Sequence, residues 1–411
     1  MTRYRLAAVA VVLVWVSLMA RLMIADLWDE TNGMVAFCDP AHSFGWNVRF
    51  VLTQSLGFWR PLPALLCAAV LHFIPNFDVN WRILRAIDTV LLIGAAALFV
   101  DAIERWSARD ERRDLLFVVA LLFSGSAIIT AGWYANIFDA SALLLIAAGA
   151  SLLSRGRAIE AGLVFGVSFY CKETTALVFP FLLLLVAAKR ITFRTAVIAG
   201  IPAAILGGIY FAIRARIVPF GSSADIHGFP LNMFLPTLIN LCDSFWRQTL
   251  KANGPGVLGF AALAFSLAML RRPRLIAAAA LLILASAVLY WQMFMPYQDG
   301  VLMSHLNFLG RLYLIPVALM LFILAIERRT IAMAILLIPI VIGGYTTYRD
   351  HMRMQRTYRR IYRTAAEAKK KPLFVDFATK PLHDPVRGIE IGAFPNALVR
   401  VDDRTGRLLY R

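Results

Sequence analysis

Residues 314–345 read LIPVALMLFILAIERRTIAMAILLIPIVIGGY, two apolar runs separated by Glu327, Arg328 and Arg329. Each run approaches the length with which a helix crosses the hydrocarbon core of a bilayer, about 17–25 residues. A short turn that carries two arginines between such runs is typical of a membrane hairpin whose turn faces the cytoplasm. We therefore predict spanning helices over 311–326 and 330–345.

The composition extends this interpretation to the whole chain. Hydrophobic residues make up 60% of the 411 residues and charged residues 16%, against about 45–50% and 25% in soluble domains. This balance excludes an ordinary water-soluble enzyme and a disordered protein. Four cysteines are too few for a disulfide-stapled secreted module. We predict an all-α polytopic membrane protein.

About eleven spans are predicted in total. The first, Leu6 to Ile24, follows Arg3 and Arg5 and is long for a secretory signal, so we interpret it as an uncleaved helix. Residues 60–75 are apolar but bounded by prolines and too short to cross a bilayer, which predicts a juxtamembrane or re-entrant helix on the outer side. The remaining spans are expected at 83–103, 115–132, 138–153, 158–171, 174–188, 195–213, 256–270 and 275–291.

Loop charge predicts the orientation. With eleven spans, 16 Lys and Arg residues fall in the N-terminus and in the short loops of one side. Positive charge is retained on the cytoplasmic side, so the N-terminus is predicted inside and the C-terminus outside. The short cytoplasmic loops are 104–114, 155–157, 189–194, 271–274 and 327–329.

The net charge of +17 is concentrated toward the C-terminus, where residues 346–411 hold 15 Lys and Arg against 7 Asp and Glu. Most other basic residues lie between apolar runs rather than on a soluble basic face, so we predict no nucleic-acid partner. Contact with anionic head groups is the simplest interpretation of the tail. The predicted parts are a membrane domain (1–345, with a first outer loop at about 25–82), an extracytoplasmic tail or small domain (346–411), a helix over 345–371, and short apolar alternations at 373–377 and 397–401.

Two of five polar motifs supply carboxylates. Asp26, Asp29 and Glu30 directly follow the first span. A carboxylate at a low-dielectric boundary can serve as a general base, although a charged helix end in the head-group region is an equally simple explanation. Asp139 is the lone acid in an apolar stretch, which predicts either a functional residue or a paired one.

The other three motifs supply cations. Arg60 stands between two aromatic residues and Pro61, where it would hold a phosphate or anchor a helix at the membrane surface. Lys172 and Glu173 lie between two apolar runs, where they would neutralise each other or offer a cation to an anionic substrate. Arg311, two residues before Tyr313, opens a span as a second phosphate ligand or an anchor.

Signals for metals and nucleotides are weak. The cysteines lack the C-x-x-C spacing of metal and redox sites. The sequence has no Walker A motif, dinucleotide glycine fingerprint or H-E-x-x-H. We predict no certain cofactor, with a divalent metal left open, as is a disulfide between Cys38 and Cys242.

Taken together, the five motifs resemble those of the type C glycosyltransferases (GT-C superfamily), integral membrane enzymes that use polyprenyl-phosphate-linked sugars. Asp29-Glu30 is similar to the Asp-Glu pair of the protein O-mannosyltransferases and of the lipid A aminoarabinose transferase. The resemblance covers about residues 1–330, and no tetratricopeptide array follows. Segments similar to the tetratricopeptide-bearing O-mannosyltransferases are Trp59–Leu62, Trp133 with Asp139, Lys172–Thr174 and Arg311–Pro316.

The resemblance implies a sugar transferase of the bacterial inner membrane with its site on the extracytoplasmic face. Asp29 would act as the base, while Glu30 and Asp139 would shape the site or hold the acceptor or a metal. The donor would be a polyprenyl-phosphate sugar, and the acceptor a lipid, a glycan or a protein. The residues implied in substrate binding are Arg60, Asp139, Lys172, Glu173, Arg311 and Tyr313.

Three other functions stay open. A transporter or lipid flippase would place polar residues near the bilayer midplane, often in two related halves. A non-catalytic subunit of a cell-envelope glycan assembly would have no need of Asp29. A different membrane transferase, such as one that moves a phospho-group, would use the same scaffold.

Overall fold

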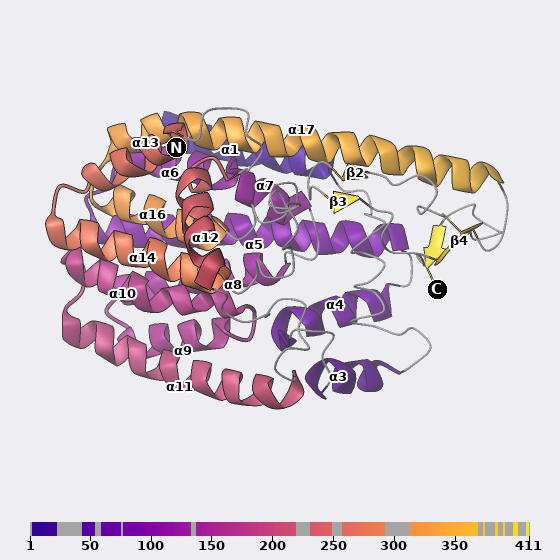
Figure 1. The fold of residues 1–411 in the computed structure, drawn as a ribbon, viewed down its shortest axis with the longest axis horizontal. Coiled ribbons are helices and arrows are strands. Elements are labelled where there is room, and N and C mark those ends of the chain that lie inside the picture. Colours follow the sequence, from indigo (N-terminus) through magenta and orange to yellow (C-terminus); the bar gives the residue numbers. More distant parts are fainter. Residues whose placement is uncertain are drawn as a thin grey trace.

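The computed structural model describes residues 2–22, 43–53, 59–74, 77–132, 137–218, 231–248, 257–291 and 313–368, together with five short C-terminal strands. Helices dominate this part of the chain (Figure 1). In chain order they are α1 (Arg3–Ala20), α3 (Phe44–Thr53), α4 (Pro61–Phe73), α5 (Phe77–Trp106), α6 (Glu111–Leu122), α7 (Gly125–Gly132), α8 (Ile137–Ser154), α9 (Ala158–Ser168), the 3-10 helix η2 (Glu173–Leu177), α10 (Val178–Ala187), α11 (Phe193–Ile217), α12 (Leu231–Ser244), α13 (Val257–Ala268), α14 (Pro273–Trp291), α16 (Leu314–Ile326) and α17 (Thr330–Ala368).

The described helices make the chain an integral membrane protein by length and composition. Six are long and apolar enough to cross a bilayer, and the pair α6–α7, bent by 53°, brings the number to seven. The other predicted spans coincide with shorter apolar helices, which are α9, η2 with α10, α13 and α16. Length and composition therefore do not establish the predicted count of about eleven crossings.

The bundle is organised around α16. Every residue of this helix is buried, as expected of a helix that is apolar on all sides. It contacts α5, α6, α8, α10, α14 and α17. By contrast, α11 exposes Phe193, Ile201 and Ile205, and only Trp15 and Met19 of α1 are buried. These outer helices present the apolar surface that a lipid environment requires.

Three helical segments depart from the sequence expectations. Helix α3 lies in the predicted first outer loop, and α12 lies between the predicted spans 195–213 and 256–270, where no helix was predicted. Within and just after α12, Leu238, Leu241 and Phe245 recur at helical spacing and pack against the core. Helix α17 joins the predicted span over 330–345 and the helix predicted over 345–371 in one unbroken helix.

A glycine allows α17 to approach the break between α6 and α7. A Cβ added at Gly344 would lie 2.0 Å from the backbone oxygen of Phe123. Any larger residue would therefore push α17 away from the bend. Helix α17 crosses residue 345 and connects the two predicted domains. The domain boundary at this residue therefore stays a prediction.

The predicted cytoplasmic loops meet at one end of the bundle. The guanidinium of Arg190 donates to the backbone oxygen of Trp106 at 2.7 Å and lies 3.2 Å from Glu327. Arg272 approaches the same Glu327 carboxylate at 3.4 Å. Further ion pairs at this end are Arg155–Asp101 at 3.0 Å and Arg5–Glu111 at 3.6 Å.

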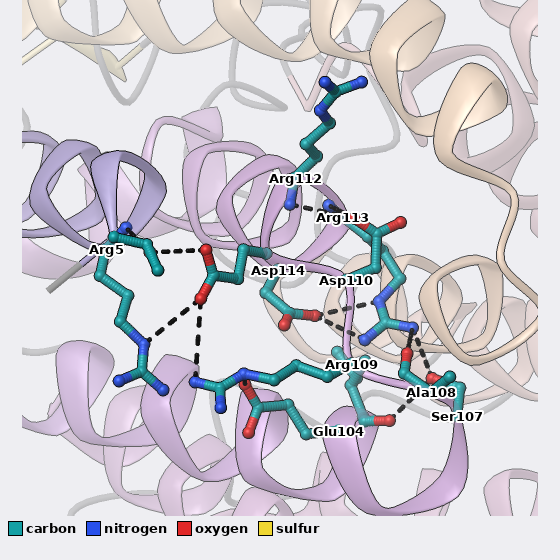
Figure 2. Close-up of polar contacts among 12 residues, drawn as sticks. Arg5, Glu104, Ser107, Ala108, Arg109, Asp110, Arg112, Arg113 and Asp114 are labelled. Atoms are coloured by element: carbon teal, nitrogen blue, oxygen red, sulfur yellow. Dashed lines mark hydrogen bonds and ion pairs between the residues drawn. The ribbon is translucent and has the colours of Figure 1, made fainter.

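The loop between α5 and α6 forms the centre of this end. Figure 2 shows Arg113 turned toward Asp114, with which it forms hydrogen bonds of 2.8 and 3.0 Å. The same guanidinium donates to Ser107 and to the backbone oxygen of Ala108. Arg109 extends to the Glu111 carboxylate that also faces Arg5. The prediction that these loops share one side is thus met, whereas the compartment they face is untested.

The opposite end carries α3, α4 and the C-terminal strands (Figure 1). The strands pair antiparallel, in the order β1-β4-β5 in one sheet and β2-β3 in the other. Each predicted apolar alternation of the tail contains a strand. Their bounds are β1 (Leu373–Phe374), β2 (His383–Asp384), β3 (Ile389–Glu390), β4 (Leu398–Val401) and β5 (Leu408–Tyr410).

Candidate functional site

Two short structural features bring the Arg60 and Lys172–Glu173 motifs together. Pro61 and Pro63 occupy the first turn of α4, where proline is favoured, and this fixes Arg60 directly before the helix. Helix α9 ends at Ser168, and the chain turns before η2 begins at Glu173. The backbone amide of Leu62 donates to the carbonyl of Tyr170, so the start of α4 rests on this turn.

Glu173 is the centre of a partly buried charge cluster. Its Oε2 lies 3.0 Å from Nε and 2.9 Å from Nη2 of Arg60. Its Oε1 accepts hydrogen bonds from the hydroxyl of Tyr210 at 2.8 Å and from Nε of Arg214 at 3.2 Å. Two guanidinium groups and one phenol therefore hold a single carboxylate, with residues from three separate segments of the chain.

The charge state of Glu173 follows from these contacts. Glu173 directly precedes the span predicted over 174–188. Burial alone raises the pKa of its carboxyl, but the nearby charges of Arg60 and Arg214 outweigh burial and lower that pKa to about 2. The carboxylate is therefore ionised at neutral pH and fixes both arginines.

An aromatic layer covers this cluster. The Trp59 ring stacks on Tyr210 at 5.5 Å and meets Tyr170 at 6.0 Å, and Trp59 is only 5% exposed. The Tyr210 hydroxyl oxygen also lies 2.7 Å from the Trp59 carbonyl oxygen, so its single proton has two acceptors within reach. A membrane-surface anchor would present its indole to the head groups. The packing instead makes Trp59 part of the wall around Arg60.

Lys172 and Glu173 do not neutralise each other, although they are adjacent. The Lys172 Nζ lies 2.5 Å from both carboxylate oxygens of Asp139, and both side chains are 2% exposed. Asp139 is thus the paired acid that the sequence allowed as one of two outcomes. The two residues are 33 positions apart in the chain, and their pairing joins the turn before η2 to α8.

A cation–π contact connects the Glu173 cluster with the Lys172–Asp139 pair. The Arg60 guanidinium lies 5.6 Å from the centroid of the Phe138 ring, next to Asp139 in α8. Three of the five sequence motifs therefore meet in one place, each in contact with the other two. Across the two groups, three cations face two carboxylates, so the site carries a net positive charge suited to an anionic ligand.

The other predicted site residues are placed differently. Asp29, Glu30 and Arg311 lie outside the described residues, as does Cys38. Tyr313 is buried at the start of α16, where its ring packs against Tyr290 at 6.4 Å. The described contacts of Tyr313 do not join it to Arg60 or Glu173. The thiol of Cys242 is free and half-buried in α12.

Sequence reasoning missed four polar residues at this end. Tyr210 and Arg214 complete the Glu173 cluster, and both lie near the end of the apolar helix α11. Arg85 and Asp88 are buried inside α5, within the span predicted over 83–103. The missed signal was the presence of ionisable residues inside apolar runs, which are expected to be functional or paired.

The described part of the chain contains no set of side chains that could bind a metal ion. Among these residues, no group of three His, Cys, Asp or Glu side chains is arranged to hold an ion. A metal held with help from Asp29 or Glu30 stays a prediction.

Comparisons with family models, with curated proteins and with solved structures find no match to this chain.

Proposed function

We propose that the chain is an integral membrane glycosyltransferase, which moves a sugar from a polyprenyl-phosphate donor to an acceptor hydroxyl at the membrane surface. The observation that carries the proposal is the meeting of the motifs around Arg60, Asp139 and Lys172. These motifs were selected from the sequence for the chemistry of their residues, and together they resemble those of one family of transferases. Independent helix anchors have no reason to contact one another.

The electrostatics of the cluster support this chemistry. When a sugar leaves a lipid phosphate, negative charge grows on the departing phosphate oxygen. Fixed cations at that position lower the barrier because they need no reorganisation during the reaction. Arg60 and Arg214, held by Glu173, and Lys172, held by Asp139, are cations of this kind. The polyprenyl tail would occupy the apolar surface between helices.

The proposed reaction is a single inverting displacement. The Asp29 carboxylate takes the proton of the acceptor hydroxyl, whose oxygen forms a bond to the anomeric carbon. The bond between that carbon and the phosphate oxygen breaks, and its electron pair leaves with the polyprenyl phosphate. Asp29 is assigned from the resemblance alone.

The proposal includes eleven crossings, with the N-terminus in the cytoplasm and the site on the outer side. The clustered loops at residues 104–114, 189–194 and 327–329 support one common side for the basic loops. Their positive charge favours the cytoplasm for that side. The Glu173 cluster then faces the extracytoplasmic surface of a bacterial inner membrane, where polyprenyl-linked sugars would reach it.

Replacing the proposed base tests the assignment. Mass spectrometry measures conversion of the polyprenyl-phosphate sugar to the free polyprenyl phosphate in membranes that contain the overproduced chain. Asp29→Asn should abolish this conversion. Asp26→Asn is the matched control, since it removes a carboxylate three residues away, and it should retain turnover. Near-full turnover by Asp29→Asn would refute the assignment of the base.

A transporter is the second candidate, because one observation favours it. Asp88 and Asp139 are buried within α5 and α8, and the neighbouring pair α6–α7 is broken by a 53° bend. Buried acids and discontinuous helices are typical of ion and substrate pathways. Uptake of a labelled substrate into proteoliposomes, with no change in donor lipid, would select this function.

A further inference from the structure

Asp88 of α5 is a buried acid that the proposed reaction does not use. It is 0% exposed, and neither of its carboxylate oxygens has a hydrogen-bond partner among the described residues. A buried polar group without a partner destabilises a fold. A chain that keeps such a group in its interior therefore has a use for it other than stability.

The surroundings of Asp88 are balanced in charge. Arg85 lies one turn earlier on the same helix, is 1% exposed and interacts electrostatically with Asp88. Asp139 interacts with Asp88 across the interface between α5 and α8, and Lys172 neutralises Asp139. Asp88 and Asp139 thus face Arg85 and Lys172, and the region has no excess negative charge to attract a metal cation.

Described residues that directly precede two stretches outside the described part of the chain contact the neighbours of Asp88. Arg85 donates a hydrogen bond to the backbone oxygen of Leu22, the last described residue before the acidic segment 26–30. His351 of α17 interacts electrostatically with Arg85. Its ring packs on Gly132, which directly precedes Trp133. Its buried Nε2 also has no hydrogen-bond partner among the described residues.

We infer that Asp88 accepts hydrogen bonds from hydroxyl groups of the sugar that the lipid donor carries, an inference that rests on the proposed function. A sugar hydroxyl is neutral and donates to a carboxyl oxygen, which suits a region with no excess of negative charge. The cations of the Glu173 cluster bind the phosphate, and Asp88 binds the sugar. Asp88 therefore distinguishes a glycosylated lipid from the bare lipid phosphate.

Binding of two lipids to the full-length chain tests this division. The probes are a short-chain polyprenyl phosphate and the same lipid carrying a hexose, measured with the purified protein in detergent. Wild type should bind the hexosyl lipid about tenfold more tightly than the bare phosphate, as one well-placed hydrogen bond provides. In Asp88→Leu this ratio should fall to about one, with the affinity for the bare phosphate unchanged.

Thr89→Val is the matched control, since it removes a neighbouring hydroxyl that bonds only to the Arg85 carbonyl of its own helix. It should keep the tenfold ratio. The thermal unfolding midpoint of Asp88→Leu should equal or exceed that of wild type, because the variant removes a buried polar group that has no hydrogen-bond partner among the described residues.

The possible failures are distinguishable. A tenfold ratio that persists in Asp88→Leu overturns the role of Asp88 and leaves the proposed transferase standing. A midpoint several degrees below that of wild type assigns Asp88 a structural role and also overturns it. Failure of wild type to bind either lipid overturns the proposed function, and the inference falls with it.

Discussion

The two ends of the helical bundle both gather charged residues, but they do so in different environments. At the loop end, Arg109 and Arg155 are 48% and 45% exposed in their ion pairs. At the opposite end, Lys172 and Asp139 are each 2% exposed, and Arg60 is 9% exposed. The outer pairs of the loop end are thus solvated, whereas Arg113 with Asp114 at its centre and the pairs around Lys172 and Glu173 are largely removed from solvent.

Solvated and buried ion pairs differ in what they contribute to stability. An exposed ion pair contributes about 0–1 kcal/mol to stability. A buried pair loses much of its attraction to desolvation, and well-packed apolar residues often replace it without loss. The pairs around Lys172 and Glu173 are therefore a poor means of stabilisation, and their presence favours a role in binding.

The largest expected effect is at the Lys172–Asp139 pair. Lys172→Met leaves the Asp139 charge buried without its partner, and we expect a loss of about 3–5 kcal/mol in unfolding free energy. Thermal or denaturant unfolding of the purified protein measures it. The double variant Lys172→Met/Asp139→Leu should recover most of the stability and still fail to bind a polyprenyl phosphate. Recovery of binding as well would make the pair purely structural.

A smaller effect is expected at Glu173. Glu173→Gln leaves Arg60 and Arg214 close together without their shared carboxylate, and we expect a loss of about 2–3 kcal/mol. Equilibrium unfolding at neutral pH measures this loss. A change within the error of wild type would show that other groups hold the two arginines.

The pH dependence of this loss follows from the lowered pKa of Glu173. The ionised carboxylate stabilises the fold fully above about pH 4.5, its ordinary pKa, and the contribution is lost as pH falls toward about 2. The stability difference between wild type and Glu173→Gln should therefore shrink over that interval. A difference that stays constant down to pH 2 would contradict the assigned contacts.

The smallest effect is expected at the loop end. Arg109→Ala removes contacts of 3.3 Å to Glu104 and 3.9 Å to Glu111, both solvated. We expect a change of less than about 1 kcal/mol in the unfolding free energy. A loss comparable to that of Lys172→Met would remove the distinction between the two ends.

Much of the helical framework was predictable, because apolar runs long enough to form helices are visible directly in the sequence. The common side of the basic loops followed from charge alone. Helix α12 was missed because its apolar residues alternate with polar ones in a segment predicted as a loop. Helix was predicted on both sides of Tyr345, over 330–345 and 345–371, but not as one unbroken helix, because hydrophobicity ends there whereas helical hydrogen bonding does not.

The site was predictable in its residues but not in its contacts. Lys172 and Glu173 were selected from the sequence, yet their partners lie on α8, α4 and α11. Spacing along the chain does not determine which way two adjacent side chains point at a turn. Arg85 and Asp88 were detectable as charges inside an apolar run, a signal that the motif comparison did not use.

Mass spectrometry of the lipids that co-purify with the wild-type chain in mild detergent tests the central claim most directly. We expect a polyprenyl phosphate or its monoglycosyl form, and the mass of the sugar would narrow the identity of the donor. We also expect this lipid to be absent from the Lys172→Met/Asp139→Leu variant. Bulk phospholipid alone in the wild-type sample, or equal amounts of the polyprenyl lipid in both samples, would contradict it.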